Sequence, residues 1–429
     1  MYILYDLIWL GGVFFLVLWF GIKRALGLRS REGILERLGF FRPNRFDVLQ
    51  GRRVIWMHAV SVGETRAAVP LLRALRHSFP GYALVFSNTT ETGHGIARDF
   101  KEIDLCLFFP FDMSWVVRRF LRRLQPELIL IVETELWPNL ARLAHRDGIP
   151  MVLVNGRLSV EAFPRYQFVK PLLRPMLGHF AIFCMQSRED AQRLLELGAP
   201  EERIMVTGNL KFDMPADGLA ERDMAALRRA LHLPAEALVW VAGSTHPGEE
   251  GLLVETYANL LSERPNLLLV LAPRHIERCP SLEKTFYEQG FSVLLRSNSV
   301  EETDLLQPGQ ILLIDTMGEL VSFYRAADLV YVGGSLVPVG GHNVLEAAMV
   351  GKPALFGPYM DNFRDIARLL VAGGGGIQID QHSLHHVVDE LLGDPDRRSL
   401  MGQSGMELLK LYAGATERTL DVIRQVLEN

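Results

Sequence analysis

The chain has 429 residues, of which 49% are hydrophobic and 22% are charged, and its formal net charge is −5. This length exceeds what one hydrophobic core usually organises, so we expect a globular protein of two domains. The mild negative charge gives no reason to expect a nucleic-acid partner. The three cysteines, Cys106, Cys184 and Cys279, lie far apart and form no C-x-x-C pair, so neither a disulfide framework nor a zinc site is indicated, and a reducing compartment fits.

An apolar segment opens the chain. Asp6 is the only charged residue between positions 2 and 22, and the unbroken apolar and glycine run over 7–22 approaches the roughly 20 residues that a membrane-spanning helix needs. Basic residues follow at Lys23, Arg24, Arg29 and Arg31. By the positive-inside rule, we predict a transmembrane anchor over 1–28, with the rest of the chain in the cytoplasm. A helix that lies against the membrane or packs on the protein is the alternative.

Short apolar runs alternate with helical patterns from residue 52 onward, which predicts parallel sheets with helices on both faces. Helical spacing is clear over 116–124 and 188–197. The runs expected to form strands are 54–57, 83–86, 105–109, 128–132, 151–154, 181–185, 204–206, 238–242, 267–271, 311–314, 329–332, 354–356 and 377–379. The sequence therefore predicts two doubly wound, Rossmann-like α/β domains that face a cleft.

A break in this alternation marks the domain boundary. The segment 214–222, MPADGLAER, contains a proline and a glycine and indicates a linker. We place an N-terminal domain at 29–213 and a C-terminal domain at 223–410. A C-terminal helix over 411–429 could pack back on the N-terminal domain.

A glycine-rich stretch over 332–363 follows one strand of the C-terminal domain. Its paired glycines let backbone N–H groups approach a ligand, and a helix expected over 343–350 would present its positive dipole end to a phosphate. Asn343 could cap this helix, and Glu346 could accept hydrogen bonds from ribose hydroxyls. The P-loop and the dinucleotide-binding fingerprint are absent. We therefore predict a nucleotide cradle, with an ordinary turn between strand and helix as the alternative.

Acidic residues follow two strands of the N-terminal domain. Glu64 comes after 54–57 at a probable helix start, and Glu133 and Glu135 come after 128–132, where a substrate hydroxyl could meet them. The helix start should favour the charged form of Glu64 and so weaken it as a base. Lys211, after 204–206, could neutralise a departing phosphate or an acidic sugar. Each residue also has a purely structural interpretation. Glu64 could only offset a helix dipole, Glu135 could only cap the helix that begins at Trp137, and Lys211 could be a solvated surface lysine.

Further polar residues follow strands of both domains. Arg274 comes after 267–271 and offers phosphate a bidentate fork. Single histidines without metal-binding spacing stand near strand ends, and we expect them to act as hydrogen-bonding residues: His58, His246, His275 and His342. A solvated helix face is expected for His382, His385 and His386. The sequence predicts no metal site and no cofactor.

A basic amphipathic pattern, WVVRRFLRRL, covers 115–124. Its arginines, Arg118, Arg119, Arg122 and Arg123, alternate with apolar residues. This pattern suits an anionic bilayer surface or a phosphorylated lipid, although an ordinary surface helix has the same composition.

Seven motifs give the chain a family resemblance. They are HAVSVGE at 58–64, ETELWPN at 133–139, TGNLKFD at 207–213, GSTHPGEE at 243–250, APRH at 272–275, MGE at 317–319 and GGSLVPVGGHNVLEAA at 333–348. Together they resemble the bacterial Kdo transferases, which attach 3-deoxy-D-manno-octulosonic acid (Kdo) to the lipid A precursor. The resemblance covers nearly the whole chain, including the N-terminal anchor.

The resemblance implies a GT-B fold and inverting transfer from CMP-Kdo without a metal ion, at the cytoplasmic face of the bacterial inner membrane. Glu64 would be the base that deprotonates the glucosamine hydroxyl, and Glu133 and Lys211 would stabilise the transition state. Whether Glu133 or Glu135 takes that role is open, because alternate residues of a strand point to opposite faces. The residues implied to contact CMP are Pro273, Arg274, Met317, Gly318, Glu319, Asn343, Val344, Leu345 and Glu346.

Two other readings remain open at this point. A sugar-nucleotide epimerase on the same two-domain plan would explain the nucleotide cradle, but neither the membrane segment nor the basic helix. A membrane-tethered protein that only binds a sugar nucleotide or a lipid would leave the acidic residues without a role. The expected partners of a transferase are CMP-Kdo, the lipid A precursor and anionic inner-membrane lipids.

Overall fold

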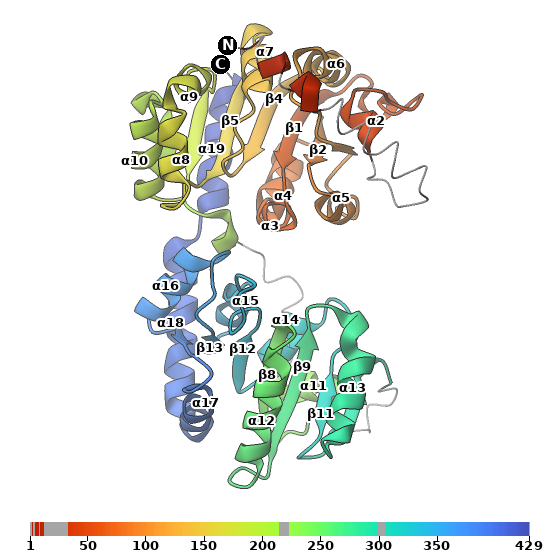
Figure 1. Ribbon diagram of the computed structural model, residues 1–429, viewed down its shortest axis with the longest axis vertical. Helices are drawn as coiled ribbons and strands as arrows, with labels where there is room; N and C mark the ends of the chain where they lie inside the picture. Colours follow the sequence, from red (N-terminus) through yellow and green to blue (C-terminus); the bar gives the residue numbers. More distant parts are fainter. Residues whose placement is uncertain are drawn as a thin grey trace. The chain divides into compact units, whose positions relative to one another are not determined.

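The computed structural model describes residues 2, 5–7, 9–12, 33–213, 223–298 and 305–428. The chain forms two compact units, one made of Met1–Pro215 with Tyr412–Asn429 and the other of Ala216–Leu411. Each unit contains one seven-stranded parallel sheet with helices on both faces (Figure 1). The predicted pair of parallel α/β domains is thus confirmed.

The first unit has the strand order β3-β2-β1-β4-β5-β6-β7. Its strands are β1 (Arg53–Ala59), β2 (Tyr82–Asn88), β3 (Leu105–Phe108), β4 (Pro126–Val132), β5 (Met151–Gly156), β6 (Ile182–Met185) and β7 (Ile204–Val206). Its helices are α2 (Ile34–Arg37), α3 (Val62–Ala67), α4 (Val69–Ser78), α5 (Glu91–Ala97), α6 (Ser114–Leu124), α7 (Pro138–Arg146), α8 (Phe163–Phe168), α9 (Lys170–Leu177), α10 (Arg188–Leu197) and α19 (Ala415–Glu428), with 3-10 turns at Asp47–Leu49, Glu201–Arg203 and Leu210–Asp213.

Alternate strand residues build the two halves of this unit's core, because successive side chains of a strand point to opposite faces. Val54 and Trp56 of β1 belong to a cluster with α6, α7, α9 and α10. Ile55 and Met57 belong to a second cluster, which α4 and α19 cover. Helix α19, at the end of the chain, therefore completes the core of the first unit.

The second unit has the strand order β10-β11-β9-β8-β12-β13-β14. Its strands are β8 (Leu238–Thr245), β9 (Leu267–Pro273), β10 (Val293–Leu295), β11 (Ile311–Leu313), β12 (Leu329–Val332), β13 (Ala354–Phe356) and β14 (Gly376–Gln378). Its helices are α11 (Met224–Ala230), α12 (Glu249–Leu261), α13 (Cys279–Glu288), α14 (Leu320–Ala326), α15 (Leu345–Met349), α16 (Arg364–Ala372), α17 (Leu384–Gly393) and α18 (Pro395–Tyr412), with 3-10 turns at Ile276–Arg278 and Arg296–Asn298.

Two predicted segments lie largely or wholly outside the described residues. Most of the predicted anchor and the whole linker at 214–222 belong to them, although Tyr5–Leu7 and Trp9–Gly12 are helical. Across the part of the chain that the structure describes, no helix is long and apolar enough to cross a membrane.

Candidate active site

Acidic side chains gather where β1 and β4 end in the first unit. These strands are neighbours at the point where the strand order reverses, which is where open α/β sheets bind ligands. Glu64 follows β1 in α3, whereas Glu133 and Glu135 follow β4. The three carboxyl groups interact electrostatically, since the charges of Glu64 and Glu133 both raise the pKa of Glu135. The structure therefore brings together the acidic residues that the sequence placed after two separate strands.

A capping box sets the position of Glu64. Ser61 is the N-cap of α3, and its hydroxyl accepts a hydrogen bond from the Glu64 backbone N–H at 3.4 Å. The Glu64 carboxylate accepts one bond from the Val60 backbone N–H at 2.7 Å and another from the Ser61 hydroxyl at 3.0 Å. This reciprocal pattern fixes the side chain at the end of β1.

The protonation of Glu64 differs from the expectation. Burial raises its pKa to about 7, and the negative charge of Glu133 raises it as well, against the opposing bonds from Val60 and Ser61. The prediction that the helix start favours the charged form is therefore wrong, because desolvation and a neighbouring carboxylate outweigh the dipole of a six-residue helix. A carboxylate with this pKa is a stronger base than an ordinary glutamate.

Glu133 adopts an unusual backbone conformation beside Lys211. Strand β4 ends at Val132, and Glu133 has a φ of 58°, a left-handed conformation that is uncommon for residues other than glycine. Its carboxylate Oε1 lies 3.8 Å from Lys211 Nζ, and both side chains are largely buried. Glu135, two residues on, has its pKa raised to about 7, first by burial and then by Glu64 and Glu133. Glu133 and Glu135 thus both belong to the acidic cluster.

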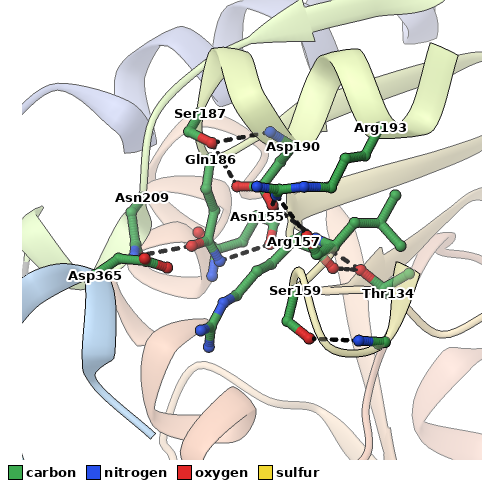
Figure 2. A network of polar contacts seen from close by, with 12 residues as sticks. Thr134, Asn155, Arg157, Ser159, Gln186, Ser187, Asp190, Arg193, Asn209 and Asp365 are labelled. Atoms are coloured by element: carbon green, nitrogen blue, oxygen red, sulfur yellow. Dashed lines mark hydrogen bonds and ion pairs between the residues drawn. The ribbon is translucent and has the colours of Figure 1, made fainter. Parts of the chain in front are cut away.

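A polar network holds the turn that carries Lys211. Three of its members, Asn155, Gln186 and Asn209, are shown in Figure 2. The Lys211 backbone N–H donates to Asn209 Oδ1 at 3.0 Å, and Asn209 Nδ2 donates to Gln186 Oε1 at 3.0 Å. Gln186 Nε2 in turn donates to the Asn155 carbonyl oxygen at 2.9 Å. Asn155 Oδ1 closes the network by accepting from the Leu210 N–H at 2.9 Å. The ends of β5, β6 and β7 therefore cooperate to place the lysine.

Aromatic rings pack together at the end of β1, the strand that precedes Glu64. The imidazole of His58, at the end of β1, stacks on Phe109 at 3.7 Å between centroids, and Phe109 lies 4.9 Å from the Trp137 ring. His58 Nδ1 is bonded to the Ser87 carbonyl oxygen at 2.9 Å, and burial lowers the pKa of His58 to about 3. Within the described ranges, His58 Nε2 and Trp137 Nε1 are buried without a hydrogen-bond partner.

The residues implied to bind CMP lie at the corresponding edge of the second sheet, where β8 and β12 are neighbours at the reversal of strand order. Pro273 pairs with Thr245 in the sheet, and the Arg274 N–H donates to the Thr245 carbonyl oxygen at 2.9 Å. Met317 is 68% exposed and Gly318 has a φ of 90°. Glu319 forms an ion pair with Arg296 at 2.9 Å, which lowers its pKa.

The helix after the glycine loop is shorter than predicted. Helix α15 spans only Leu345–Met349, and its N-cap is Val344 rather than Asn343. Asn343 still supports the helix start, since its Oδ1 accepts from the Leu345 N–H at 3.2 Å and its Nδ2 lies 3.4 Å from Glu346 Oε1. At Gly341, with a φ of 73°, a Cβ atom would lie 2.3 Å from Met360 Sδ, so the loop requires glycine there.

Glu249, which sequence reasoning missed, organises this loop. Its Oε1 accepts from the Tyr331 hydroxyl at 2.6 Å and from the N–H groups of Ser335 and Leu336, both at 2.9 Å. Its Oε2 accepts from the N–H groups of His246 at 2.9 Å and Gly334 at 2.7 Å. The only sequence signal was a pair of glutamates after β8, within GSTHPGEE. This buried carboxylate ties the end of β8 to the glycine loop after β12.

Two histidines that seemed isolated in the sequence are in direct contact. His246 Nε2 lies 2.9 Å from His342 Nε2, and the His275 ring meets the His246 ring edge-on at 5.9 Å between centroids. No local spacing could reveal this pair, because the residues are 96 positions apart. Only their common place after the neighbouring strands β8 and β12 could have suggested it.

The basic pattern forms helix α6, whose apolar face is buried in the core. Arg119, Arg122 and Arg123 are exposed, whereas Arg118 is partly buried. Trp115, at the start of the helix, is 47% exposed, and the Arg119 guanidinium lies over the ring of Phe40, itself 52% exposed. Basic and aromatic side chains therefore share this surface.

The described N-terminal residues contact the same region. Asp6 Oδ1 accepts from the Ser114 N–H at 2.9 Å and from Asn139 Nδ2 at 2.8 Å. Asp6 Oδ2 accepts from the Ser114 hydroxyl at 2.5 Å. The one acidic residue of the apolar segment thus joins the starts of α6 and α7.

Comparisons with known proteins agree with the motifs. The family model described as 3-Deoxy-D-manno-octulosonic-acid transferase (kdotransferase) matches residues 32–214. A 3-deoxy-D-manno-octulosonic acid transferase of Haemophilus influenzae is 34% identical over 411 residues, which cover 95% of this chain and 94% of that protein. Another, of Bordetella pertussis, is 35% identical over 87% of each chain.

A solved structure shares the fold. The UDP-GlcNAc 2-epimerase of Neisseria meningitidis, bound to UDP-GlcNAc, superposes with a TM-score of 0.58 over 88% of this chain and 100% of that chain. Because the two sequences are only 14% identical, the similarity concerns the fold alone.

Proposed function

Because the chain belongs to the 3-deoxy-D-manno-octulosonic acid (Kdo) transferase family, we propose that it is a glycosyltransferase that transfers Kdo from CMP-Kdo to a glucosamine hydroxyl of a lipid A precursor in lipopolysaccharide biosynthesis. In this proposal the first unit binds the acceptor and the second unit binds CMP-Kdo. Transfer inverts the configuration at the sugar carbon and needs no metal ion.

Glu64 is the base in the proposed reaction. Its carboxylate takes the proton of the attacking hydroxyl while the oxygen forms its bond to the Kdo carbon, and the bond from that carbon to the phosphate breaks. The pKa of about 7 supports this role, because a base works best when its pKa lies near the working pH. The capping box engages both carboxylate oxygens with neutral donors, the Val60 N–H and the Ser61 hydroxyl.

Glu133 and Lys211 stabilise the transition state. Positive charge develops at the sugar carbon as its bond to the phosphate breaks, and a carboxylate opposes that charge. Lys211 complements the negative charge of the leaving phosphate or of the Kdo carboxylate. Their 3.8 Å separation and their burial support the assignment, because charges act more strongly where water is excluded. Glu135 tunes the cluster by its charge.

The CMP contacts fall on three segments of the second unit. Arg274 offers a fork to the phosphate. The Met317–Glu319 turn and the segment 343–346 would contact the cytidine and the ribose, with the Glu346 carboxylate as a hydroxyl acceptor. The glycine loop supports this assignment, because Glu249 holds it rigidly against the end of β8.

The acceptor is a lipid, so the proposal places the enzyme at the cytoplasmic face of the bacterial inner membrane. A transmembrane anchor within residues 7–22 and the exposed arginines of α6 would hold it there. The sharing of one surface by Arg119, Trp115 and Phe40 supports this placement, since aromatic and basic side chains suit the bilayer interface.

The acidic cluster with Lys211 is the observation that carries the proposal, and its test is direct transfer. Purified protein is incubated with a tetraacylated lipid A precursor and freshly generated CMP-Kdo, with chelator present, and the product is weighed by mass spectrometry. We expect a mass increase of one or more Kdo units from the wild type, none from Glu64→Gln, and an undiminished increase from Glu202→Gln, an exposed control in the same unit. A wild type that adds no mass, or a Glu64→Gln variant with full activity, would refute the proposal.

A further inference from the structure

The contact between His246 and His342 is an in-plane hydrogen bond. The two Nε2 atoms are 2.9 Å apart, the ring planes differ by 12°, and the centroids are 5.1 Å apart. The centroid distance exceeds the distance between the nitrogen atoms by about the two ring radii, so the rings meet edge to edge in one plane rather than face to face. One ring must donate and the other must accept, and a single proton therefore lies between them.

A neutral pair joined in this way has two different outer ends. The donor ring has its proton on Nε2, so its Nδ1 carries a lone pair. The acceptor ring uses the lone pair of Nε2, so its Nδ1 carries a proton. A proton that leaves one outer end can be replaced through the shared bond from the other end. The geometry is that of a two-ring proton relay.

The surroundings of His246 favour its neutral form in the free protein. Burial lowers the pKa of His246, and the charges of His275 and Arg274 lower it further against the acids Glu249 and Glu250. Glu249 accepts from backbone N–H groups of the glycine loop and of His246, and Glu250 is paired with Arg278 at 2.7 Å. Burial and the neighbouring positive charges therefore oppose protonation of the His246 ring.

The glycine loop is shaped to admit the two rings. At Gly334, with a φ of 67°, a Cβ atom would lie 2.9 Å from His342 Cδ2 and 3.3 Å from His246 Cδ2. The Glu249 carboxylate fixes the backbone N–H groups of both Gly334 and His246. The charge of Arg274, after β9, acts on His246, and Asn343 directly follows His342 in the chain; both are residues assigned to CMP.

We propose that His246 and His342 form a proton relay to the phosphate that leaves with CMP, an inference that rests on the proposed transferase function. As the bond between the Kdo carbon and the phosphate oxygen breaks, its electron pair stays on that oxygen, which takes the Nδ1 proton of the ring that faces it. The shared Nε2 proton moves to this ring, and the second ring takes a proton from water at its Nδ1. The hydroxyl proton that Glu64 accepted returns to solvent, so protons and charges balance.

The test compares His246→Gln, His342→Gln and the double variant with the wild type. Glutamine can hydrogen-bond but cannot pass a proton between two ends, so each single variant should lower kcat for transfer on the order of 10²-fold, with KM for CMP-Kdo little changed. The double variant should fall no further than the singles, since either change breaks the relay. His382→Gln, an exposed histidine of the same unit, should keep the wild-type kcat.

Two results would overturn the relay. One is a single variant whose kcat stays within about twofold of the wild type, and the other is a double variant whose losses multiply. Calorimetric binding of CMP and the melting temperature show whether each variant is folded, and the corresponding asparagine variants replace any that is not. A wild type without transfer activity refutes the proposed function itself, whereas an active wild type with active variants refutes only the relay.

Discussion

Replacing Glu64 by glutamine should abolish transfer and yet stabilise the first unit above neutral pH. Burial and Glu133 raise the Glu64 pKa from 4.5 to about 7. At about 1.4 kcal/mol for each pKa unit, ionising Glu64 in the folded protein opposes folding by about 3 kcal/mol. Because the folded pKa is the higher one, the favourable contribution of protonated Glu64 is complete below about pH 4.5 and is lost as the pH rises through about 7. The glutamine variant has no such loss.

Part of this gain is offset by weaker hydrogen bonds. Glutamine also forms capping boxes, and its carbonyl oxygen can accept from the Val60 N–H while its amide faces the Ser61 hydroxyl, which can rotate to accept. Exchanging charged for neutral acceptors costs about 1 kcal/mol. We therefore expect Glu64→Gln to raise the free energy of unfolding by roughly 2 kcal/mol at pH 8.5 and to leave it nearly unchanged at pH 5.

Tryptophan fluorescence during urea unfolding reports mainly on the first unit, because it contains four of the five tryptophans among the described residues: Trp9, Trp56, Trp115 and Trp137. The control is Glu202→Gln, in which an exposed carboxyl of the same unit is lost. Its difference from the wild type should be small at every pH. A Glu64→Gln variant that is less stable than the wild type at pH 8.5, or whose difference is the same at both pH values, would refute the reasoning.

Three other features carry predictions. Glu135→Gln removes a negative charge that interacts with Glu64 and should therefore lower the Glu64 pKa. The acid limb of the pH profile of kcat/KM, which reports that pKa, should move to lower pH. An unmoved limb would exclude electrostatic coupling between the two residues. Glu249→Gln turns an amide N–H toward buried backbone donors and should destabilise the second unit by roughly 2–4 kcal/mol, visible by calorimetry, whereas an unchanged transition would contradict that role. Replacing the four arginines of α6 by glutamine should weaken binding to anionic liposomes, measured by sedimentation, by about 1 kcal/mol for each exposed arginine. Binding to neutral liposomes should stay unchanged. Equal binding of variant and wild type to anionic liposomes would make α6 an ordinary surface helix.

The sheets could be predicted because buried parallel strands are continuous apolar runs, as in 128–132 and 267–271. Strand β10 escaped prediction because it has three residues, all only partly buried, at the edge of its sheet. The helix after the glycine loop was predicted too long, since 343–350 has helical composition throughout. In the structure, the positive φ of Gly351 ends that helix early and the Asn343 side chain delays its start.

The proximity of the candidate site residues could be predicted from the sequence, but not their protonation state. The glutamates and Lys211 come directly after strands, and the carboxyl ends of parallel strands share one edge, so their proximity followed from the fold class. The Glu64 pKa depends on burial and on the distance to a residue 69 positions away, and neither is a local property. The local signal, the helix start, predicted that the charged form of Glu64 is favoured, whereas its pKa is raised. The pairing of His246 with His342 likewise requires two loops to be folded before it can be recognised.

Glu64 and Glu249 occupy equivalent places in the two sheets and have opposite surroundings. Each lies in the helix that follows the strand at the reversal of strand order, β1 or β8, and each accepts from a backbone N–H a few residues earlier. The loop after the neighbouring strand makes the difference. After β12 it turns three N–H groups toward Glu249, which fix that carboxylate as a structural acceptor. After β4 the left-handed turn at Glu133 brings two more carboxyl groups toward Glu64, so that this carboxylate holds a proton near neutral pH. In the proposed reaction, the same topology therefore supplies a rigid nucleotide loop in one domain and a base in the other. The difference depends on whether the loop after the neighbouring strand presents hydrogen-bond donors or carboxyl groups.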